Sequence, residues 1–342
     1  MRQFASIPVN VLTGYLGSGK TTLLKQLLQT GDASRTAVLI NEFGEVSLDH
    51  LIVEQVSATT VVLQNGCVCC SIRSDLKAGL HALIDGSNRG DVPEFDMILI
   101  ETTGLADPVP IVQTLVADPM LRHQVRLANL ISTVDCMNGL LQLATQPEAG
   151  RQAATADRLV ITKTDLAGDH DIERLHVALA AINPSASIVR APIEKNLWNA
   201  LLSEHAFDPA RKSDEVRRWL GSVGAEIRGR HFEAVSVDNH TASIKSFVFR
   251  TRKQMDWTAF AVWLSLLVHR HGAKVLRVKG LLAVAGARGP ILLNAVQNFV
   301  HPPVHIDVWP DEDISSRLVF ILQDLDTEAV RASLEEFLEL NN

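Results

Sequence analysis

Short apolar runs alternate with longer amphipathic stretches over roughly the first two hundred residues. The apolar runs are rich in Val, Ile and Leu, as expected of strands that are buried on both faces of a sheet. Strands are predicted at 8–13, 36–40, 60–63, 97–100, 127–134, 158–162 and 187–190, and helices at 21–29, 74–84 and 172–181. This alternation predicts an α/β architecture, a mostly parallel sheet covered by helices.

The pattern changes after a polar stretch at 208–239. Strands then follow one another at 243–251, 275–285, 291–300, 305–309 and 317–322, with helices at 256–271 and 327–340. Asp326 is the expected N-cap of the last helix. Strands in succession with few helices predict a smaller, separate α+β domain. The expected organisation is an α/β domain at 1–208, a linker at 209–239 and the α+β domain at 240–342.

Length and charge narrow the classes of function. A chain of 342 residues favours two domains over one. The 32 Lys+Arg and 39 Asp+Glu residues give a formal charge of −7, which argues against a nucleic-acid binder, because such proteins usually carry a basic face. The sequence predicts neither a signal peptide nor a membrane span. We therefore expect a soluble, cytoplasmic protein with no nucleic-acid or membrane partner.

A complete phosphate-binding motif stands between the first predicted strand and the first predicted helix. The segment GYLGSGKT matches G-x-x-x-x-G-K-[ST] in the context that this motif requires. Glycines let backbone N–H groups turn toward phosphate oxygens, and the helix N-terminus adds partial positive charge. Lys20 is expected to neutralise the β- and γ-phosphates, and Thr21 to place its hydroxyl on Mg²⁺. The candidate nucleotide-binding residues are Gly14, Gly17, Ser18, Gly19, Lys20 and Thr21.

A second motif, TKTD at 162–165, indicates which base is bound. The carboxylate of Asp165 can accept hydrogen bonds from guanine N1–H and from its exocyclic amine, a donor pair that adenine lacks. The aliphatic stem of Lys163 can cover the base plane. This is the logic of the GTPase N-K-x-D signature, with Thr162 in place of Asn. The alternative interpretation is a surface Lys–Asp loop.

The segment ETTG at 101–104 follows another predicted buried strand. Glu101 can hold Mg²⁺ through water or orient the attacking water, and with Lys20 it is the predicted catalytic pair. The backbone N–H of Gly104 is expected to contact the γ-phosphate and to be released when that group leaves. No Gln stands in the adjacent segment to position water, so slow intrinsic hydrolysis is predicted.

Three of the four cysteines, Cys67, Cys69 and Cys70, lie within one Cys-x-Cys-Cys motif. Thiolates favour Zn²⁺, Co²⁺ and other soft or borderline metals, so this is the predicted metal site. In an extended segment Cys67 and Cys69 face one side and Cys70 the other, so two or three of them are expected to ligate one ion.

A fourth metal ligand must come from elsewhere in the chain or from water. Glu42 is a candidate, as are Glu45 and His50, because the loop at 41–49 should also approach the γ-phosphate. Core cysteines, a redox pair and a structural zinc remain as alternatives. Cys136, by itself, is expected to be a packed core residue.

Together these motifs resemble one known family. GYLGSGKTT, NEFGEVSLD at 41–49, NGCVCC at 65–70, ETTG and TKTD are similar to the CobW family of P-loop GTPases, which belongs with the hydrogenase and urease nickel-insertion GTPases. The segments 275–280 and 315–320 resemble the C-terminal domain of that family. The resemblance implies a P-loop NTPase domain followed by a CobW-type domain, over nearly the whole chain.

The resemblance also implies a function. In the family the phosphate-loop residues, which here include Thr22, bind GTP with Mg²⁺, and the cysteine motif binds the transferred metal. The expected protein is a GTP-hydrolysing metallochaperone that delivers zinc or cobalt to a client metalloprotein, with the second domain recognising that client. A homodimer is a further option. Thr162 in place of the usual Asn puts a loop-bracing contact in question rather than the choice of base.

Other functions remain open from the sequence alone. One is a kinase-like nucleotide-binding protein with a structural zinc. Another is a regulatory GTPase with redox-active cysteines. The position of the cysteines between the phosphate-sensing segments favours the metallochaperone.

Overall fold

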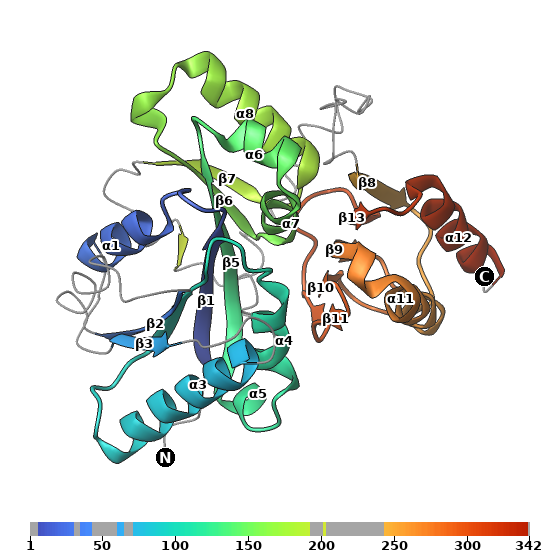
Figure 1. Cartoon of the computed structure of the whole chain (residues 1–342). Helices are drawn as coiled ribbons and strands as arrows, with labels where there is room; N and C mark the ends of the chain where they lie inside the picture. The colour runs from blue at the N-terminus through green and yellow to red at the C-terminus, as the bar shows by residue number, and fades with distance from the viewer. Residues whose placement is uncertain are drawn as a thin grey trace. The chain divides into compact units, whose positions relative to one another are not determined.

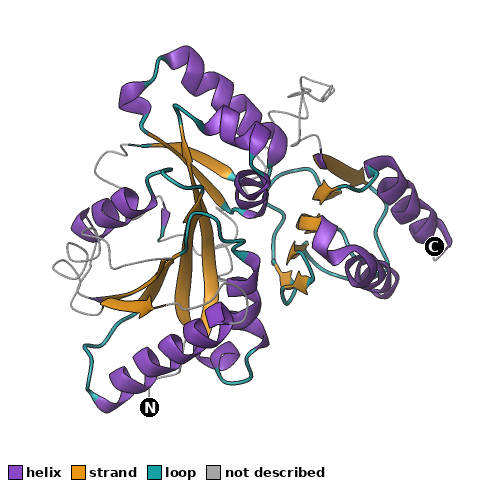
Figure 2. Ribbon diagram, in the orientation of Figure 1, coloured by secondary structure: helices purple, strands orange, loops and turns teal. Residues whose placement is uncertain are grey.

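The computed structural model of the chain describes residues 6–30, 35–42, 60–64, 71–191, 201–202 and 243–340. Two compact units are present, drawn in Figures 1 and 2. The first contains residues 1–139, 156–173 and 188–208, and the second contains residues 140–155, 174–187 and 209–342. The linker expected at 209–239 lies outside the described residues, so its boundaries stay a prediction.

The first unit is built on a mostly parallel sheet, as predicted. Its described strands lie in the order β3-β2-β4-β1-β5-β6-β7. The pairs β3–β2, β2–β4, β4–β1, β1–β5 and β5–β6 are all parallel. Their carboxyl ends therefore meet at one edge of the sheet. The strands are β1 (Ile7–Gly14), β2 (Thr36–Glu42), β3 (Thr60–Gln64), β4 (Met97–Glu101), β5 (Val125–Asp135), β6 (Arg158–Thr162) and β7 (Ser187–Arg190).

Helices follow most of these strands. They are α1 (Lys20–Thr30), α3 (Ser71–Arg89), α4 (Val109–Ala117), α5 (Leu121–Gln124), α6 (Gly139–Thr145), α7 (Pro147–Thr155) and α8 (Asp169–Ile182). Of these, α7 and most of α6 and α8 fall within the second unit. Leucines at helical spacing on α1, including Leu23 and Leu27, pack on Leu12, Val38 and Leu99 of the sheet. The sequence analysis missed α4 to α7. Helix α4 begins after Pro108, whose fixed φ suits a first helical turn.

The second unit contains an antiparallel sheet with the order β11-β10-β9-β13-β8, and β12 pairs with β10. Helices α11 (Trp257–His271) and α12 (Thr327–Leu340) cover one face, where Trp263 and Leu334 join Phe320 in the core. Asp326 caps α12 as predicted, since its Oδ1 accepts from the N–H of Glu328 at 2.9 Å. The strands are β8 (Ile244–Thr251), β9 (Val275–Leu282), β10 (Ile291–Val296), β11 (Phe299–Val300), β12 (Val304–His305) and β13 (Ser316–Gln323).

Two strand predictions in the second unit were wrong. The run at 291–300 is not one strand but a hairpin of β10 and β11, because the chain turns at Gln297, which adopts a left-handed φ of 50°. The strand expected at 305–309 ends at His305. Pro303 and Pro310 flank this segment, and prolines lack the N–H that a sheet ladder needs.

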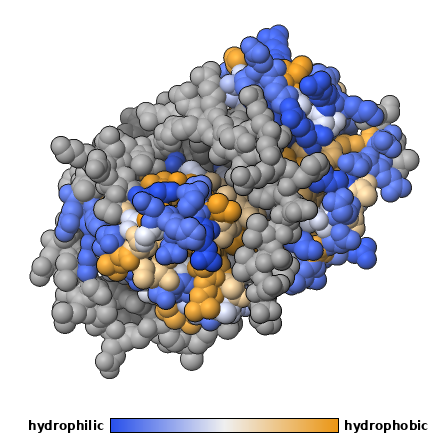
Figure 3. All heavy atoms as spheres, turned by 90° about the horizontal axis from the view of Figure 1, so that it is seen from above, coloured by the Kyte–Doolittle hydropathy of each residue, from blue (hydrophilic) through white to orange (hydrophobic). Residues whose placement is uncertain are grey.

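Where Figure 3 colours the surface by hydropathy, hydrophilic areas alternate with apolar ones. Such areas are ordinary, because a folded chain has too little polar surface to cover itself. In the part of the chain that the structure describes, no helix is long and apolar enough to cross a membrane.

Asp118 ties three helices of the first unit together. Its Oδ2 accepts from Lys77 Nζ of α3 at 2.6 Å, and its Oδ1 accepts from the backbone N–H groups of Met120 and Leu121, each at 3.0 Å. Asp118 also closes the carboxyl end of α4. The hydrogen bond from Lys77 and that from Leu121 lower the pKa of Asp118 to about 2, although burial opposes them.

Substituting Asp118→Asn should destabilise the protein in a pH-dependent way. A carboxyl group whose pKa is lower in the folded than in the unfolded state stabilises the fold. This contribution is fully present above the unfolded-state pKa of ~3.9 and is lost as the pH falls through the folded-state pKa. The difference in free energy of unfolding between wild type and D118N should therefore be largest above about pH 4 and shrink toward pH 2. Chemical denaturation at several pH values measures it.

Asp91→Asn is the matched control for this experiment, because Asp91 forms an exposed ion pair with Arg89, and such pairs contribute little to stability. A wild-type advantage over D118N that stays constant from pH 7 to pH 2 would contradict the assignment.

Candidate functional site

The loop between β1 and α1 follows a path that glycine permits. Gly14, Gly17 and Gly19 have φ values of 143°, 71° and 89°, in the left-handed region that favours glycine. Lack of space also excludes a side chain at Gly14, because a Cβ there would lie 2.2 Å from Thr133 Oγ1. The three glycines of the motif are thus required by the backbone path that the phosphate-binding interpretation expects.

Polar contacts hold this loop on the sheet. The Nζ of Lys20 donates to the carbonyl oxygens of Gly14 at 3.0 Å and Tyr15 at 3.3 Å, so the ammonium lies folded over the loop. Ser18 Oγ lies 2.7 Å from Thr133 Oγ1 of β5, with both hydroxyls buried. Thr22, by contrast, is exposed on the first turn of α1.

The structure brings together Thr21 and Glu101, which the sequence analysis assigned to Mg²⁺ and catalysis. Thr21 Oγ1 donates to Glu101 Oε1 at 2.6 Å. Glu101 ends β4 and is only 5% exposed, and Thr21 stands at the start of α1. A hydroxyl and a carboxylate oxygen at this distance suit a hard cation such as Mg²⁺, which prefers oxygen ligands.

The segment after Glu101 lies against the phosphate loop. A Cβ on Gly104 would meet the backbone nitrogen and Cα of Leu16 at 2.7 and 2.8 Å, so glycine is needed for this close approach. Thr102 Oγ1 donates to Thr13 Oγ1 at 3.0 Å, and its backbone N–H donates to the carbonyl of Leu12 at 2.9 Å. The two segments are therefore in direct contact, and a movement of one displaces the other.

The TKTD segment also touches the phosphate loop. Thr162 Oγ1 donates to the carbonyl oxygen of Ser18 at 2.7 Å and lies 3.3 Å from that of Val134. The loop-bracing contact that the absent Asn put in question is therefore present and is made by the shorter hydroxyl. Lys163 has a left-handed φ of 56° and opens the 3₁₀ turn η2 (Thr164–Leu166), in which the side chain of Asp165 is exposed.

One charged residue of this site escaped the sequence analysis. Asp135 ends β5 and accepts a hydrogen bond from Lys163 Nζ at 2.8 Å. Burial opposes the ionisation of Asp135, but the hydrogen bonds from Lys163, Asn138 and the N–H of Met137 lower its pKa below the usual value. The feature of the sequence that could have identified Asp135 is its position as a carboxylate at the carboxyl end of a buried strand.

The candidate metal ligands Cys67, Cys69 and Cys70 lie outside the described residues, as do Glu45 and His50. Within the described ranges, His, Cys, Asp and Glu form no group of three that could hold a metal ion.

Two other predictions of the sequence analysis concern described residues. Glu42 ends β2, in register with Gln64 of β3. Cys136 is buried as expected, and burial, with the nearby charge of Asp135, raises the pKa of its thiol.

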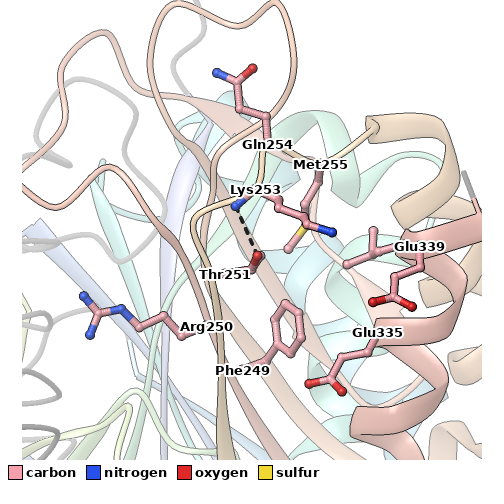
Figure 4. Close-up of a pocket in the computed structure, with 9 residues that line it drawn as sticks. Phe249, Arg250, Thr251, Lys253, Gln254, Met255, Glu335 and Glu339 are labelled. Carbon is pink, nitrogen blue, oxygen red and sulfur yellow. Dashed lines mark hydrogen bonds between the residues drawn. The ribbon is translucent and has the colours of Figure 1, made fainter. Parts of the chain in front are cut away.

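The second unit has a separate pocket of about 170 Å³ between the end of β8 and α12. Its apolar residues are Phe249, Met255 and Leu338, and Glu335 and Glu339 of α12 face them (Figure 4). None of the residues predicted from sequence to form a site lies in it. The remaining lining residues are Arg250, Thr251, Lys253 and Gln254.

Comparisons with known proteins identify the family. The nucleotide-binding domain described as CobW/HypB/UreG matches residues 8–190, and the cobalamin synthesis protein cobW C-terminal domain matches residues 244–338. The chain belongs to the CobW/HypB/UreG family. This confirms the resemblance to CobW proteins and the fold class predicted from the sequence. The CobW-family chain is thus a P-loop GTPase that uses GTP and Mg²⁺, for which the phosphate loop and the Thr21–Glu101 pair provide fitting groups.

The chain is similar to proteins of Escherichia coli and Schizosaccharomyces pombe. It is 33% identical over 331 residues to the zinc chaperone YjiA of Escherichia coli (strain K12), covering 96% of this chain and 97% of that protein. It is 35% identical over 281 residues to zinc-regulated GTPase metalloprotein activator 1 of Schizosaccharomyces pombe, covering 77% of this chain and 66% of that protein.

A solved structure agrees with the fold. The crystal structure of Zn(II)-bound YjiA GTPase from E. coli has a TM-score of 0.68 and 27% sequence identity to this chain, covering 97% of it and 99% of that chain.

Substituting Thr162→Val should weaken GTP binding by removing the brace on Ser18. The lost hydrogen bond is worth about 0.5–1.5 kcal/mol, so the Kd for GTP should rise roughly 2- to 12-fold. Titration with a fluorescent GTP analogue measures the change. Thr114→Val removes a comparable bond, from Thr114 Oγ1 to the carbonyl of Pro110 inside α4, and should leave the Kd unchanged. Equal Kd values for T162V and wild type would contradict a bracing role.

Proposed function

We propose that this CobW-family GTPase is a metallochaperone that binds a transition metal at Cys67, Cys69 and Cys70. Its metal is zinc rather than cobalt, because the similar proteins of E. coli and S. pombe are named for zinc. It releases the metal to a client protein when GTP is hydrolysed. The observation that carries the proposal is the order of strands at the carboxyl edge of the first sheet.

That order links the cysteine motif to the nucleotide site. Strand β3, which leads into the motif, pairs with β2, and Gln64 is in register with Glu42. Strand β2 pairs in turn with β4, where Ile40 is in register with Glu101. All three strands run parallel and end at the same edge. Cys67 follows Gln64 by three residues, a span of at most about 11 Å, so chain length limits how far the first cysteine can lie from the end of β3.

Glu42 fits the role of a further metal ligand. Its position beside Gln64 is the last residue of a strand at the same edge. A carboxylate oxygen is an accepted partner of thiolates on Zn²⁺. We propose that Glu42 joins the cysteines when GTP is bound.

The chemistry of hydrolysis rests on the groups at this edge. Lys20 neutralises the charge of the phosphates, and Thr21 and Glu101 would hold Mg²⁺, which would neutralise further phosphate charge. Glu101 also orients the attacking water. Gly104 lies close against Leu16 of the phosphate loop, and on this basis we propose that the segment 101–104 responds to the presence of the γ-phosphate. Release of this segment after hydrolysis then loosens the neighbouring metal ligands.

The second unit is the proposed client-binding part of the chain. It has its own core around Trp263 and Phe320, and so presents a stable surface that nucleotide chemistry does not require. The client is a metalloprotein that accepts the metal from the cysteines.

Zinc affinity should depend on the bound nucleotide. Coupling between two sites typically changes affinity by about 5- to 150-fold and is reciprocal, so zinc should tighten GTP binding by the same factor. Anaerobic zinc titration of the chain loaded with a non-hydrolysable GTP analogue, and of the chain loaded with GDP, measures this ratio. Cys69→Ser should abolish the tight site in both forms.

Cys136→Ala is the control, because this cysteine is buried and should leave zinc binding unchanged. Equal zinc affinity in the two nucleotide forms would exclude nucleotide-controlled release. Zinc that resists chelators in both forms would instead indicate a structural site.

A further inference from the structure

We propose that Asp135 is a positioning residue for base recognition, and that it acts through Lys163 to fix how tightly and how selectively the GTPase holds guanine. The proposal concerns the GTPase activity and is independent of the metal that the chain carries. Asp135 lies outside the TKTD motif and comes from the neighbouring strand.

The carboxylate of Asp135 is the acceptor for three donors. Its Oδ2 accepts from Lys163 Nζ at 2.8 Å and from Asn138 Nδ2 at 2.9 Å, and its Oδ1 accepts from the N–H of Met137 at 2.8 Å. The Asp135 side chain is 2% exposed, whereas that of Lys163 is 36% exposed. A buried carboxylate therefore holds the terminal ammonium of a partly exposed lysine, which fixes the path of the aliphatic stem between that ammonium and the backbone.

Only a carboxylate satisfies this arrangement. An Asn at position 135 has one acceptor oxygen and one NH₂ group. If its oxygen faces Lys163 and Asn138, its NH₂ group faces the N–H of Met137. If it is turned round, its NH₂ group faces the ammonium of Lys163. A donor meets a donor in both cases, and the opposite charge is lost in both, so the isosteric amide holds Lys163 less firmly than the carboxylate does.

The orientation of Lys163 also determines that of Asp165. Lys163 takes the left-handed backbone conformation, which side chains disfavour, and the 3₁₀ turn η2 with Asp165 follows at once. On the far side of Lys163, Thr164 Oγ1 donates to the carbonyl of Ala191. The ion pair to Asp135 and this hydrogen bond together hold the start of the turn. Loss of the ion pair between Lys163 and Asp135 should therefore misplace two groups. One is the Lys163 stem that covers the guanine base, and the other is the Asp165 carboxylate at the edge of that base.

The base is present in GTP and in GDP, which gives the proposal a kinetic signature. An interaction made equally in the ground state and the transition state changes KM and leaves kcat unaltered. Asp135→Asn should raise the KM for GTP and the Kd for GDP by the same factor, roughly tenfold, the scale of one lost hydrogen bond to a charged group. The kcat at saturating GTP should stay at the wild-type value.

The same variant should lose selectivity. ITP lacks the exocyclic amine that Asp165 is expected to recognise, so the wild-type enzyme should prefer GTP to ITP. In D135N the KM values for GTP and ITP should converge. A merely structural role of Asp135 would lower the fraction of folded enzyme without altering this ratio.

Asp157→Asn is the matched control. Asp157 is also a buried carboxylate that accepts a backbone N–H of β5, that of Leu130 at 2.9 Å, but it precedes β6 at the opposite end from TKTD. D157N should lower thermal stability and leave both KM values unchanged. Asn138→Ala, at an exposed position, removes one donor to Asp135 with little risk to folding and should raise the KM for GTP about two- to threefold.

A double-mutant cycle tests whether Asp135 acts through Lys163. If it does, D135N should add nothing to the KM of Lys163→Met, because neighbouring residues in one network are not additive. Three results would each overturn the proposal: additive effects in this cycle, a kcat that falls with KM constant, or wild-type KM values in both D135N and N138A.

Discussion

At the carboxyl edge of the first sheet, backbone segments approach so closely that two glycines have no room for a side chain. A Cβ on Gly14 would overlap Thr133 of β5, and one on Gly104 would overlap the backbone of Leu16. These contacts join the ends of β1, β4 and β5. Because atoms at this density cannot move independently, the phosphate loop, the segment after Glu101 and the end of β5 are packed as one block. The TKTD turn joins this block through the hydrogen bond from Thr162 to the carbonyl of Ser18.

Hydrogen bonds from short side chains complete this packing. The hydroxyl of Thr162 reaches Ser18, that of Ser18 reaches Thr133, and that of Thr21 reaches Glu101. A hydroxyl group both donates and accepts hydrogen bonds. It is also short enough to fit between backbones that a longer amide side chain would push apart. Charged side chains of this site pair with opposite charges or form hydrogen bonds. This arrangement lets carboxylates such as Asp135 stay ionised although burial opposes it.

Much of this protein follows from local patterns. Parallel strands, the helix at the phosphate loop and the N-cap at Asp326 could be predicted, because each depends on residues a few positions apart. The same holds for Gly14, Gly17 and Gly19, whose φ values are properties of the loop itself. The prediction of a continuous strand at 291–300 was wrong because the turn at Gln297 carries neither glycine nor proline to mark it.

The sequence by itself thus determined the α/β fold class, the order of the nucleotide motifs and the composition of the cysteine motif. Only the tertiary structure decided which groups meet. Asp135 reaches Lys163 across 28 residues, and Thr162 reaches the carbonyl of Ser18 across 144. Neither contact produces a periodic pattern in the sequence. The reason is that the pairing order of the strands, and not their spacing along the chain, decides which strand ends meet. The same pairing set Glu42 beside Gln64 and linked β3 to the edge that carries Glu101.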